Sequence, residues 1–296
     1  MPIARDRRYH PTMIPIRDML RSRRFPVVTV SLIVINLLVF LYQGYLGTQE
    51  PLWDDWSDER IAWLDAGLAP PPIFDPVYAY TTRRAPGRAP STYEIPADDW
   101  FLMAYALTPG ELLGGTDLPP TIPIPLWLTL LTSIFMHGSI MHVLGNMLYL
   151  WIFGDNVEDA MGSARFLVFY LLCGAVATFA QIAIGPGSSI PVVGASGAIA
   201  GVLAAYFMLY PYARVMTIIP IFFFIRLVAL PAVILLGFWF ILQVISGAGA
   251  LGSSGGVAWF AHIGGFIAGL ILVFPFRRRG VPVTLWNSIR RGRLRP

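Results

Sequence analysis

Six apolar stretches, separated by polar blocks, dominate the pattern of hydrophobic and polar positions along the chain. They lie at 27–45, 137–153, 166–184, 197–210, 229–246 and 257–276. Most of them are long enough, at the rise of an α-helix, to cross a bilayer whose hydrocarbon core is about 30 Å thick. The pattern therefore predicts an all-α polytopic membrane protein with six transmembrane helices.

The polar blocks between these stretches divide the chain into five parts. We expect a basic cytoplasmic segment over 1–25, a retained first span over 26–46, an extracytoplasmic loop over 47–126, a membrane core over 127–276 and a basic cytoplasmic tail over 277–296. The loop holds twelve acidic residues, whereas the tail holds seven arginines and no acidic residue. Arginine-rich ends remain on the cytoplasmic side of a membrane, so both termini are predicted to be cytoplasmic.

Composition narrows the class of protein. Apolar residues make up 56% of the chain and the mean hydropathy is +0.63, which exceeds the usage of ordinary soluble domains. All 21 basic residues are arginine and many flank the apolar stretches, which favours lipid over nucleic acid as the partner. The single cysteine, Cys173, excludes an intrachain disulfide and is expected to be a small buried apolar residue.

The fourth apolar stretch is too short to cross the bilayer. Its 14 residues, 197–210, give about 21 Å of helix against about 30 Å of hydrocarbon. Because Tyr210 and Arg214 mark its inner end, Ser196 at the other end is predicted to lie about 10 Å below the outer surface. The preceding loop, 185–195, must then enter the membrane, where irregular backbone needs protein or water around it.

Ser196 and His262 are candidates for a catalytic pair. Ser196 lies beside the free amide groups of a helix N-terminus, which supply donors for a developing oxyanion. Small residues recur along 194–201 and again at Gly265 and Gly269, so the fourth and sixth helices can approach closely. This approach would bring the imidazole of His262 to Ser196 as a general base. The alternative is that the small residues form only a packing surface.

A lysine base is excluded because the chain has no lysine. The acidic residues close to the spans, Asp155, Glu158 and Asp159, fall on the cytoplasmic side under the predicted topology. We therefore expect a dyad without a third, acidic member.

His142 and Asn146 are four residues apart and share one face of the second helix. Polar side chains at membrane depth are costly unless they serve a site, so both are candidates for oxyanion binding. Hydrogen bonding between helices is the alternative for this pair. A channel, or a metal site formed by His137, His142 and His262, is a further alternative; otherwise no metal or cofactor is expected.

Three sequence blocks resemble the signature blocks of rhomboid intramembrane serine proteases. They are His137-Gly-Ser-Ile-Met-His142-Val-Leu-Gly-Asn146-Met, Gly194-Ala-Ser196-Gly and Ala261-His262-Ile-Gly-Gly265. The resemblance covers 126–276, about half of the chain, and implies a six-helix rhomboid bundle whose catalytic core is 127–276. It implies Ser196 as nucleophile, His262 as base and then acid, and His142 and Asn146 as oxyanion ligands. It also implies cleavage of single-span membrane proteins near helix-destabilising residues, without a cofactor.

The chain departs from the rhomboid pattern at two positions. Leu128 follows Trp127 where the family often has a Trp-Arg pair, which removes an arginine anchor from the first loop. Ala200 stands where better-known bacterial members carry a tyrosine that packs on the histidine. We therefore expect another group to orient His262.

By the same resemblance, the fifth span and the loop after it form a gate and cap for substrate. This part includes Trp239, Phe240, Gln243 and the Gly-Ser stretch 246–256, and a plain connector is the alternative. The segment 214–226 is apolar and closed by arginines, so we expect an interfacial or packed cytoplasmic element there.

Together these features predict an intramembrane serine endopeptidase in a prokaryotic cell membrane. Its expected partners are membrane lipid and single-span transmembrane proteins. The alternative is a catalytically inactive rhomboid-like protein that escorts or retains membrane proteins, although such relatives lack the serine or the histidine and this chain has both.

Overall fold

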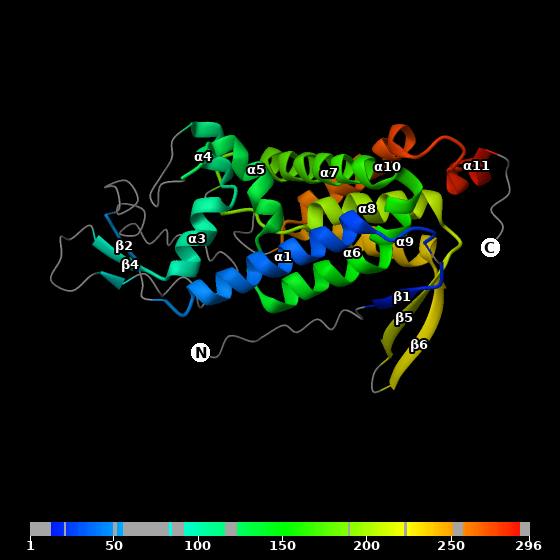
Figure 1. Cartoon of the computed structure of the whole chain (residues 1–296), viewed down its shortest axis with the longest axis horizontal. Helices are drawn as coiled ribbons and strands as arrows, with labels where there is room; N and C mark the ends of the chain where they lie inside the picture. The colour runs from blue at the N-terminus through cyan, green and yellow to red at the C-terminus, as the bar shows by residue number, and fades with distance from the viewer. Residues whose placement is uncertain are drawn as a thin grey trace.

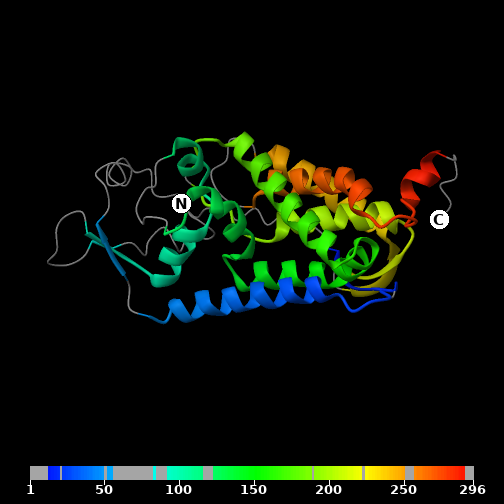
Figure 2. The ribbon, with the colours of Figure 1, turned by 45° about the horizontal axis from the view of Figure 1, so that its top comes forward.

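Long helices lying side by side form the main body of the described part of the chain, and Figure 1 and Figure 2 show them from two directions. The computed structural model describes residues 13–20, 22–49, 52–55, 83–84, 92–115, 123–188, 190–221, 224–250 and 257–290. Its elements are β1 (Ile14–Asp18), α1 (Val27–Leu46), β2 (Leu52–Asp55), β3 (Arg83–Arg84), β4 (Thr92–Ile95), α3 (Ala97–Tyr105), α4 (Pro109–Gly114), η2 (Leu126–Leu128), α5 (Thr129–Thr132), η3 (Ser133–Phe135), α6 (Ile140–Met161), α7 (Ser163–Ile184), α8 (Ser196–Leu209), β5 (Arg214–Ile221), β6 (Phe224–Pro231), α9 (Ala232–Gly249), α10 (Trp259–Phe276) and α11 (Thr284–Arg290).

Four of the described helices are long and apolar enough to cross a membrane: α1, α7, α9 and α10. Leu126–Phe135 and Ile140–Met161 together are long and apolar enough for a fifth crossing, and the chain bends by 80° at the break between them. α8 is apolar but has only 14 residues. A multi-pass, mainly helical membrane protein is thus confirmed, while the count of six spans stays a prediction.

The helix boundaries differ from the predicted stretches by a few residues. The largest difference is at α6, which was expected over 137–153 and instead runs from Ile140 to Met161. Its polar last turns remain helical because they bind other elements: Glu158 accepts hydrogen bonds from the backbone N–H groups of Val28 (3.0 Å) and Thr29 (2.8 Å) and from the hydroxyl of Ser163 (2.6 Å). This carboxylate therefore caps the N-terminus of α1 and joins it to α6 and α7.

α8 lies inside the bundle, in contact with α6, α7, α9 and α10, and most of its side chains are buried. Two glycines on α8, Gly197 and Gly201, face two on α10, Gly265 and Gly269, and we call these four residues the glycine seam. A Cβ atom built on Gly265 would overlap the carbonyl oxygen of Gly197, and one on Gly269 would overlap that of Gly201. The two backbones are thus in direct contact, as small residues in membrane helices allow.

Two small three-stranded sheets were not predicted. One has the order β2-β4-β3 and lies near α3 and α4, and the other has the order β1-β5-β6, at the opposite end of the helices in Figure 1. Strands β5 and β6 form an antiparallel hairpin from the segment expected only as an interfacial or packed element, and β1 pairs with β5. An apolar run of eight residues fits a buried strand or a short helix, so its composition does not identify a hairpin.

Asp18, at the end of β1, connects this second sheet to the helices. Its Oδ2 atom accepts hydrogen bonds from the hydroxyl of Tyr206 on α8 (2.9 Å) and from Nδ2 of Asn156 on α6 (2.8 Å). Burial, which disfavours the charged carboxylate, raises the pKa of Asp18 from 3.8 to about 6, and the nearby charge of Asp155 acts in the same direction.

Parts of the predicted domains fall outside the described residues. They are 1–12 and 21 in the basic segment, most of 50–91 and all of 116–122 in the loop 47–126, 189, 222–223 and 251–256 in the core, and 291–296 in the basic tail. The division into five parts and the orientation of the termini stay predictions.

The first prediction concerns the glycine seam. Gly265→Ala forces α8 and α10 apart, because its methyl group has no space beside the Gly197 carbonyl, and we expect a loss of about 1–3 kcal/mol in the free energy of unfolding. Gly44→Ala on α1 is the matched control, since a Cβ there has nothing within 4 Å. Equal stability of the two variants in detergent micelles would contradict the contact.

The second prediction concerns pH. The folded protein binds a proton at Asp18 more tightly than the unfolded chain does, so this group stabilises the fold at low pH and loses that effect as pH rises from 3.8 to about 6. Asp18→Asn removes the titrating group but keeps an acceptor oxygen. We expect the unfolding midpoint of the wild type, relative to that of Asp18→Asn, to fall across this interval in circular dichroism melts. Parallel curves would show that Asp18 does not titrate there.

Candidate active site

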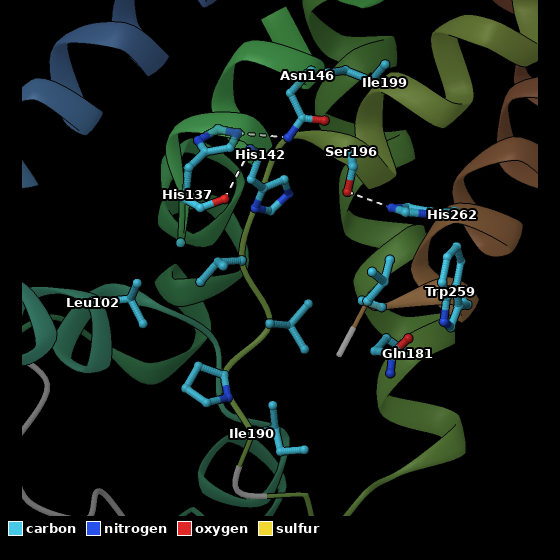
Figure 3. Close-up of a pocket in the computed structure, with 18 of the residues that line it drawn as sticks. Leu102, His137, His142, Asn146, Gln181, Ile190, Ser196, Ile199, Trp259 and His262 are labelled. Carbon is cyan, nitrogen blue, oxygen red and sulfur yellow. Dashed lines mark hydrogen bonds between the residues drawn. The ribbon is translucent and has the colours of Figure 1, made fainter. Parts of the chain in front are cut away.

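Ser196 and His262 are in hydrogen-bonding contact. The Oγ atom of Ser196 lies 2.8 Å from Nε2 of His262, as Figure 3 shows. Ser196 is the first residue of α8, and His262 lies in the first turn of α10. The glycine seam below them holds the two helices together, so both side chains start from the same end of one contact surface.

The other ring nitrogen of His262 also has a partner. Nδ1 lies 2.8 Å from Oε1 of Gln243 on α9. The rings of Trp239 on α9 and Trp259 on α10 also lie near the imidazole, with centroids 5.9 Å and 6.1 Å from that of its ring. These groups lie around His262 and can orient its ring. Ala200, which is fully buried, has no aromatic ring that could do so.

Sequence reasoning missed the contact between Gln243 and His262. Gln243 was predicted only as part of a gate for substrate, because a sequence does not give the rotation of one helix about its axis relative to another. Its one usable signal was a polar side chain in the middle of an apolar helix. The rest of the predicted cap, 251–256, lies outside the described residues.

Gly194 brings the loop before α8 against His142 and Asn146. Its φ angle is +111°, which a residue with a side chain rarely adopts. A Cβ atom there would lie 2.8 Å from Nε2 of His142 and 3.7 Å from Nδ2 of Asn146. The two nitrogens thus face the backbone beside Ser196, where an oxyanion would form during acyl transfer.

Asn146 is held by His137. Its Nδ2 atom lies 2.9 Å from Nε2 of His137, and an amide NH₂ group has two donors, so this bond uses one of them. The backbone of His137 is in turn bonded on both its N–H and its carbonyl by the side chain of Gln43 on α1, at 3.3 Å each. His137 therefore supports Asn146 and joins the site to α1.

The structure gives no support to the alternative of a metal site formed by three histidines. Within the described ranges, no three His, Cys, Asp or Glu side chains gather in a way that could hold a metal ion. Nε2 of His262 instead faces Ser196, and Nε2 of His137 faces Asn146.

The loop between α7 and α8 has its backbone bonded to other parts of the protein. The N–H of Gly194 donates to the carbonyl of Ser133 (2.9 Å), Val192 pairs with Leu107 as an isolated β-bridge, and the carbonyl of Ser188 accepts from the N–H of Gly110 (2.9 Å). These contacts give hydrogen-bond partners to backbone N–H and C=O groups that would have none in the hydrocarbon core of the bilayer.

Ser196, His262, His142 and Asn146 all line one cavity of about 1180 Å³. Its wall also includes Ser139, Gln181, Asp98 and Asp99, together with apolar side chains such as Trp259 and Ile190. A cavity with this mixed lining can hold water beside an apolar chain. The candidate residues chosen from the sequence are thus brought together around a single space.

The fold and the site define a class: a multi-pass helical membrane protein with a serine–histidine pair beside a mixed polar and apolar cavity. A sequence model described as the rhomboid domain matches residues 125–279, just over half of the chain. The chain therefore belongs to the rhomboid family.

Three relatives illustrate the range of the match. The chain is 35% identical over 153 residues to "Rhomboid protease GluP" of Bacillus subtilis, covering 50% of this chain and 27% of the relative. It is 31% identical over 174 residues to "Presenilin-associated rhomboid-like protein, mitochondrial" of Homo sapiens, covering 54% and 42%. It is 32% identical over 182 residues to "RHOMBOID-like protein 4" of Arabidopsis thaliana, covering 62% and 42%. The matched part spans less than half the length of each relative.

A third prediction tests the backbone at Gly194. Gly194→Ala imposes a side chain at φ +111° and places its methyl group against the ring of His142, so we expect Ser196 to react more slowly with a fluorophosphonate by at least about tenfold. Gly187→Ala, in the same loop with nothing within 4 Å of its Cβ, is the control. Labelling of Gly194→Ala at the control rate would contradict the proposed geometry, provided that circular dichroism shows intact helices in both.

Proposed function

We propose that the protein is an intramembrane serine endopeptidase in which Ser196 is the nucleophile and His262 the general base. The observation that carries this proposal is the 2.8 Å contact between Oγ of Ser196 and Nε2 of His262 at the start of two helices in contact. A serine hydroxyl is a weak nucleophile by itself, and a neutral imidazole in this position activates it. The rhomboid family supports the same class of reaction.

In the proposed reaction, Oγ of Ser196 attacks the carbonyl carbon of the scissile peptide bond, and Nε2 of His262 takes the hydroxyl proton. The carbonyl oxygen becomes an oxyanion. When the bond to the leaving amine breaks, His262 gives the proton to that nitrogen, which leaves an acyl ester on Ser196. Water then attacks the ester, with His262 again as base, and hydrolysis restores the serine and releases the acid.

The oxyanion is proposed to receive hydrogen bonds from the backbone N–H of Ser196 and from the side chains of His142 and Asn146. A helix N-terminus favours negative charge, and Gly194 brings the backbone within reach of both side chains. Loss of one such donor typically costs about 2.7–4 kcal/mol of transition-state stabilisation, so each is a substantial part of the rate.

Single-span transmembrane proteins are the proposed substrates. A peptide bond inside a helix is shielded by the helix, and its carbonyl already accepts a hydrogen bond, so cleavage requires a locally extended chain. Substrates with helix-destabilising residues near the cleaved bond meet this requirement most easily. The apolar residues around the cavity, such as Trp259 and Ile190, suit an apolar chain.

The catalytic core is proposed to be 127–276, set in a cell membrane with both arginine-rich ends in the cytoplasm. Residues 26–46 would add the first span, and 47–126 would lie outside. A prokaryotic plasma membrane is proposed as the location; one of the three relatives named above, the human protein, is mitochondrial by its name.

The decisive test uses purified protein in proteoliposomes with a single-span reporter. We expect Ser196→Ala and His262→Ala each to lower the cleavage rate by at least about a thousandfold, with helix content unchanged, because each removes a group that acts in the transition state. Asn36→Ala, on α1 away from the cavity, serves as a substitution control.

Reaction with a fluorophosphonate separates an enzyme from an escort protein. Specific labelling of Ser196 supports the protease. Absence of labelling together with no cleavage by the wild type would overturn it in favour of a binding role, and undiminished cleavage in Ser196→Ala would show that Ser196 is not the nucleophile.

A further inference from the structure

Gln243 lies where the acidic member of a serine protease triad would act. It projects from α9 toward the imidazole of His262, is only 6% exposed, and places Oε1 2.8 Å from Nδ1 of the ring. The sequence spacing of 19 residues separates the two side chains, and they belong to different helices, α9 and α10. The contact is therefore tertiary and not a consequence of helical periodicity.

The orientation of the Gln243 amide is fixed by a second hydrogen bond. Its Nε2 atom donates to the backbone carbonyl of Trp239, one turn earlier in α9, at 3.1 Å. If the amide were turned over, its oxygen would face that carbonyl, and two acceptors would oppose each other. The oxygen must then be the atom that faces His262.

This orientation determines where the proton of His262 lies. An amide oxygen can only accept, so Nδ1 of His262 must carry the hydrogen. A neutral imidazole has one N–H, which leaves Nε2 with a lone pair directed at the hydroxyl of Ser196, 2.8 Å away. The hydrogen bonds thus run donor to acceptor in one direction, from the hydroxyl of Ser196 through His262 and Gln243 to the carbonyl of Trp239. In this arrangement the serine hydroxyl donates its proton to Nε2 of His262.

We propose that Gln243 is the positioning residue of the catalytic base: it selects the Nδ1–H form of His262, fixes the ring in the plane that reaches Ser196, and stabilises the imidazolium after proton transfer. This inference rests on the proposed function. A neutral amide performs here the orienting role that a carboxylate has in a Ser-His-Asp triad. It also accounts for a base that works with alanine at position 200.

The first test compares two replacements of Gln243 in proteoliposomes with a single-span reporter. Gln243→Met keeps the length of the side chain but has no amide, and we expect kcat to fall by about tenfold with KM unchanged. Gln243→Glu keeps an acceptor oxygen, and we expect it to restore kcat to within about threefold of the wild type. Ile245→Met, on the exposed side of the same helix, is the matched control and should leave kcat unchanged.

Three results would overturn the role of Gln243. The first is an unchanged kcat in Gln243→Met. The second is an equal loss of kcat in Gln243→Met and Gln243→Glu, which would indicate a packing role alone. The third is a rise in the KM of Gln243→Met that accounts for its whole loss of activity. If wild-type cleavage depends on Ser196 while Gln243→Met is fully active, only this inference fails. If cleavage does not depend on Ser196, the proposed function itself fails.

A spectroscopic test needs no replacement at position 243. In protein labelled with ¹⁵N-histidine, the signals of His262, assigned by their loss in His262→Ala, report which ring nitrogen carries the proton. We expect a protonated Nδ1 and an unprotonated Nε2 near neutral pH. The opposite tautomer would contradict the inference even if every Gln243 variant failed to fold.

Discussion

The direct backbone contact between α8 and α10 fixes the positions of the two side chains on which the candidate chemistry depends. Neither helix could approach the other so closely with a side chain at Gly265 or Gly269, because the space is filled by carbonyl groups of α8. Ser196 opens one helix and His262 lies in the first turn of the other, so the glycine seam sets their separation. A short helix buried among longer ones thereby supports the candidate nucleophile.

Other contacts hold the surroundings of this pair in place from several directions. Gln243 approaches the imidazole from α9, and Gln43 on α1 holds the backbone of His137, which in turn bonds Asn146. At the far end of the helices, Glu158 caps α1 and Asp18 attaches β1 to α6 and α8. These polar contacts therefore form two sets, one around the cavity and one that joins the helix ends.

Much of this arrangement could be predicted from the sequence. Apolar length identified the long helices, and the short stretch ending at Tyr210 correctly indicated a truncated helix, although α8 begins at Ser196 itself. Ser196 and His262 could be paired because glycines at helical spacing imply close approach, which is a local pattern with a geometric consequence. His142 and Asn146 could be placed on one helix face because they are four residues apart, and the predicted topology put them at the same membrane level as Ser196 and His262.

The remainder depends on how separate elements are rotated and paired, which no local pattern contains. The hairpin of β5 and β6 was hidden because a short apolar run fits several structures. Gln243 could not be linked to His262 without the orientation of α9. His137 was considered only as a ligand of the alternative metal site, and its bond to Asn146 instead gives it a supporting position.

The central claim is that a serine at the start of a buried short helix is activated by a histidine from the neighbouring helix. An experimental structure of the protein in a lipid nanodisc, with a phosphonate bound, tests it most directly. The account predicts a covalent bond from phosphorus to Oγ of Ser196, His262 within hydrogen-bonding distance of that oxygen, and both below the level of the headgroups. A phosphonate attached elsewhere, or a His262 ring turned away toward lipid, would contradict it.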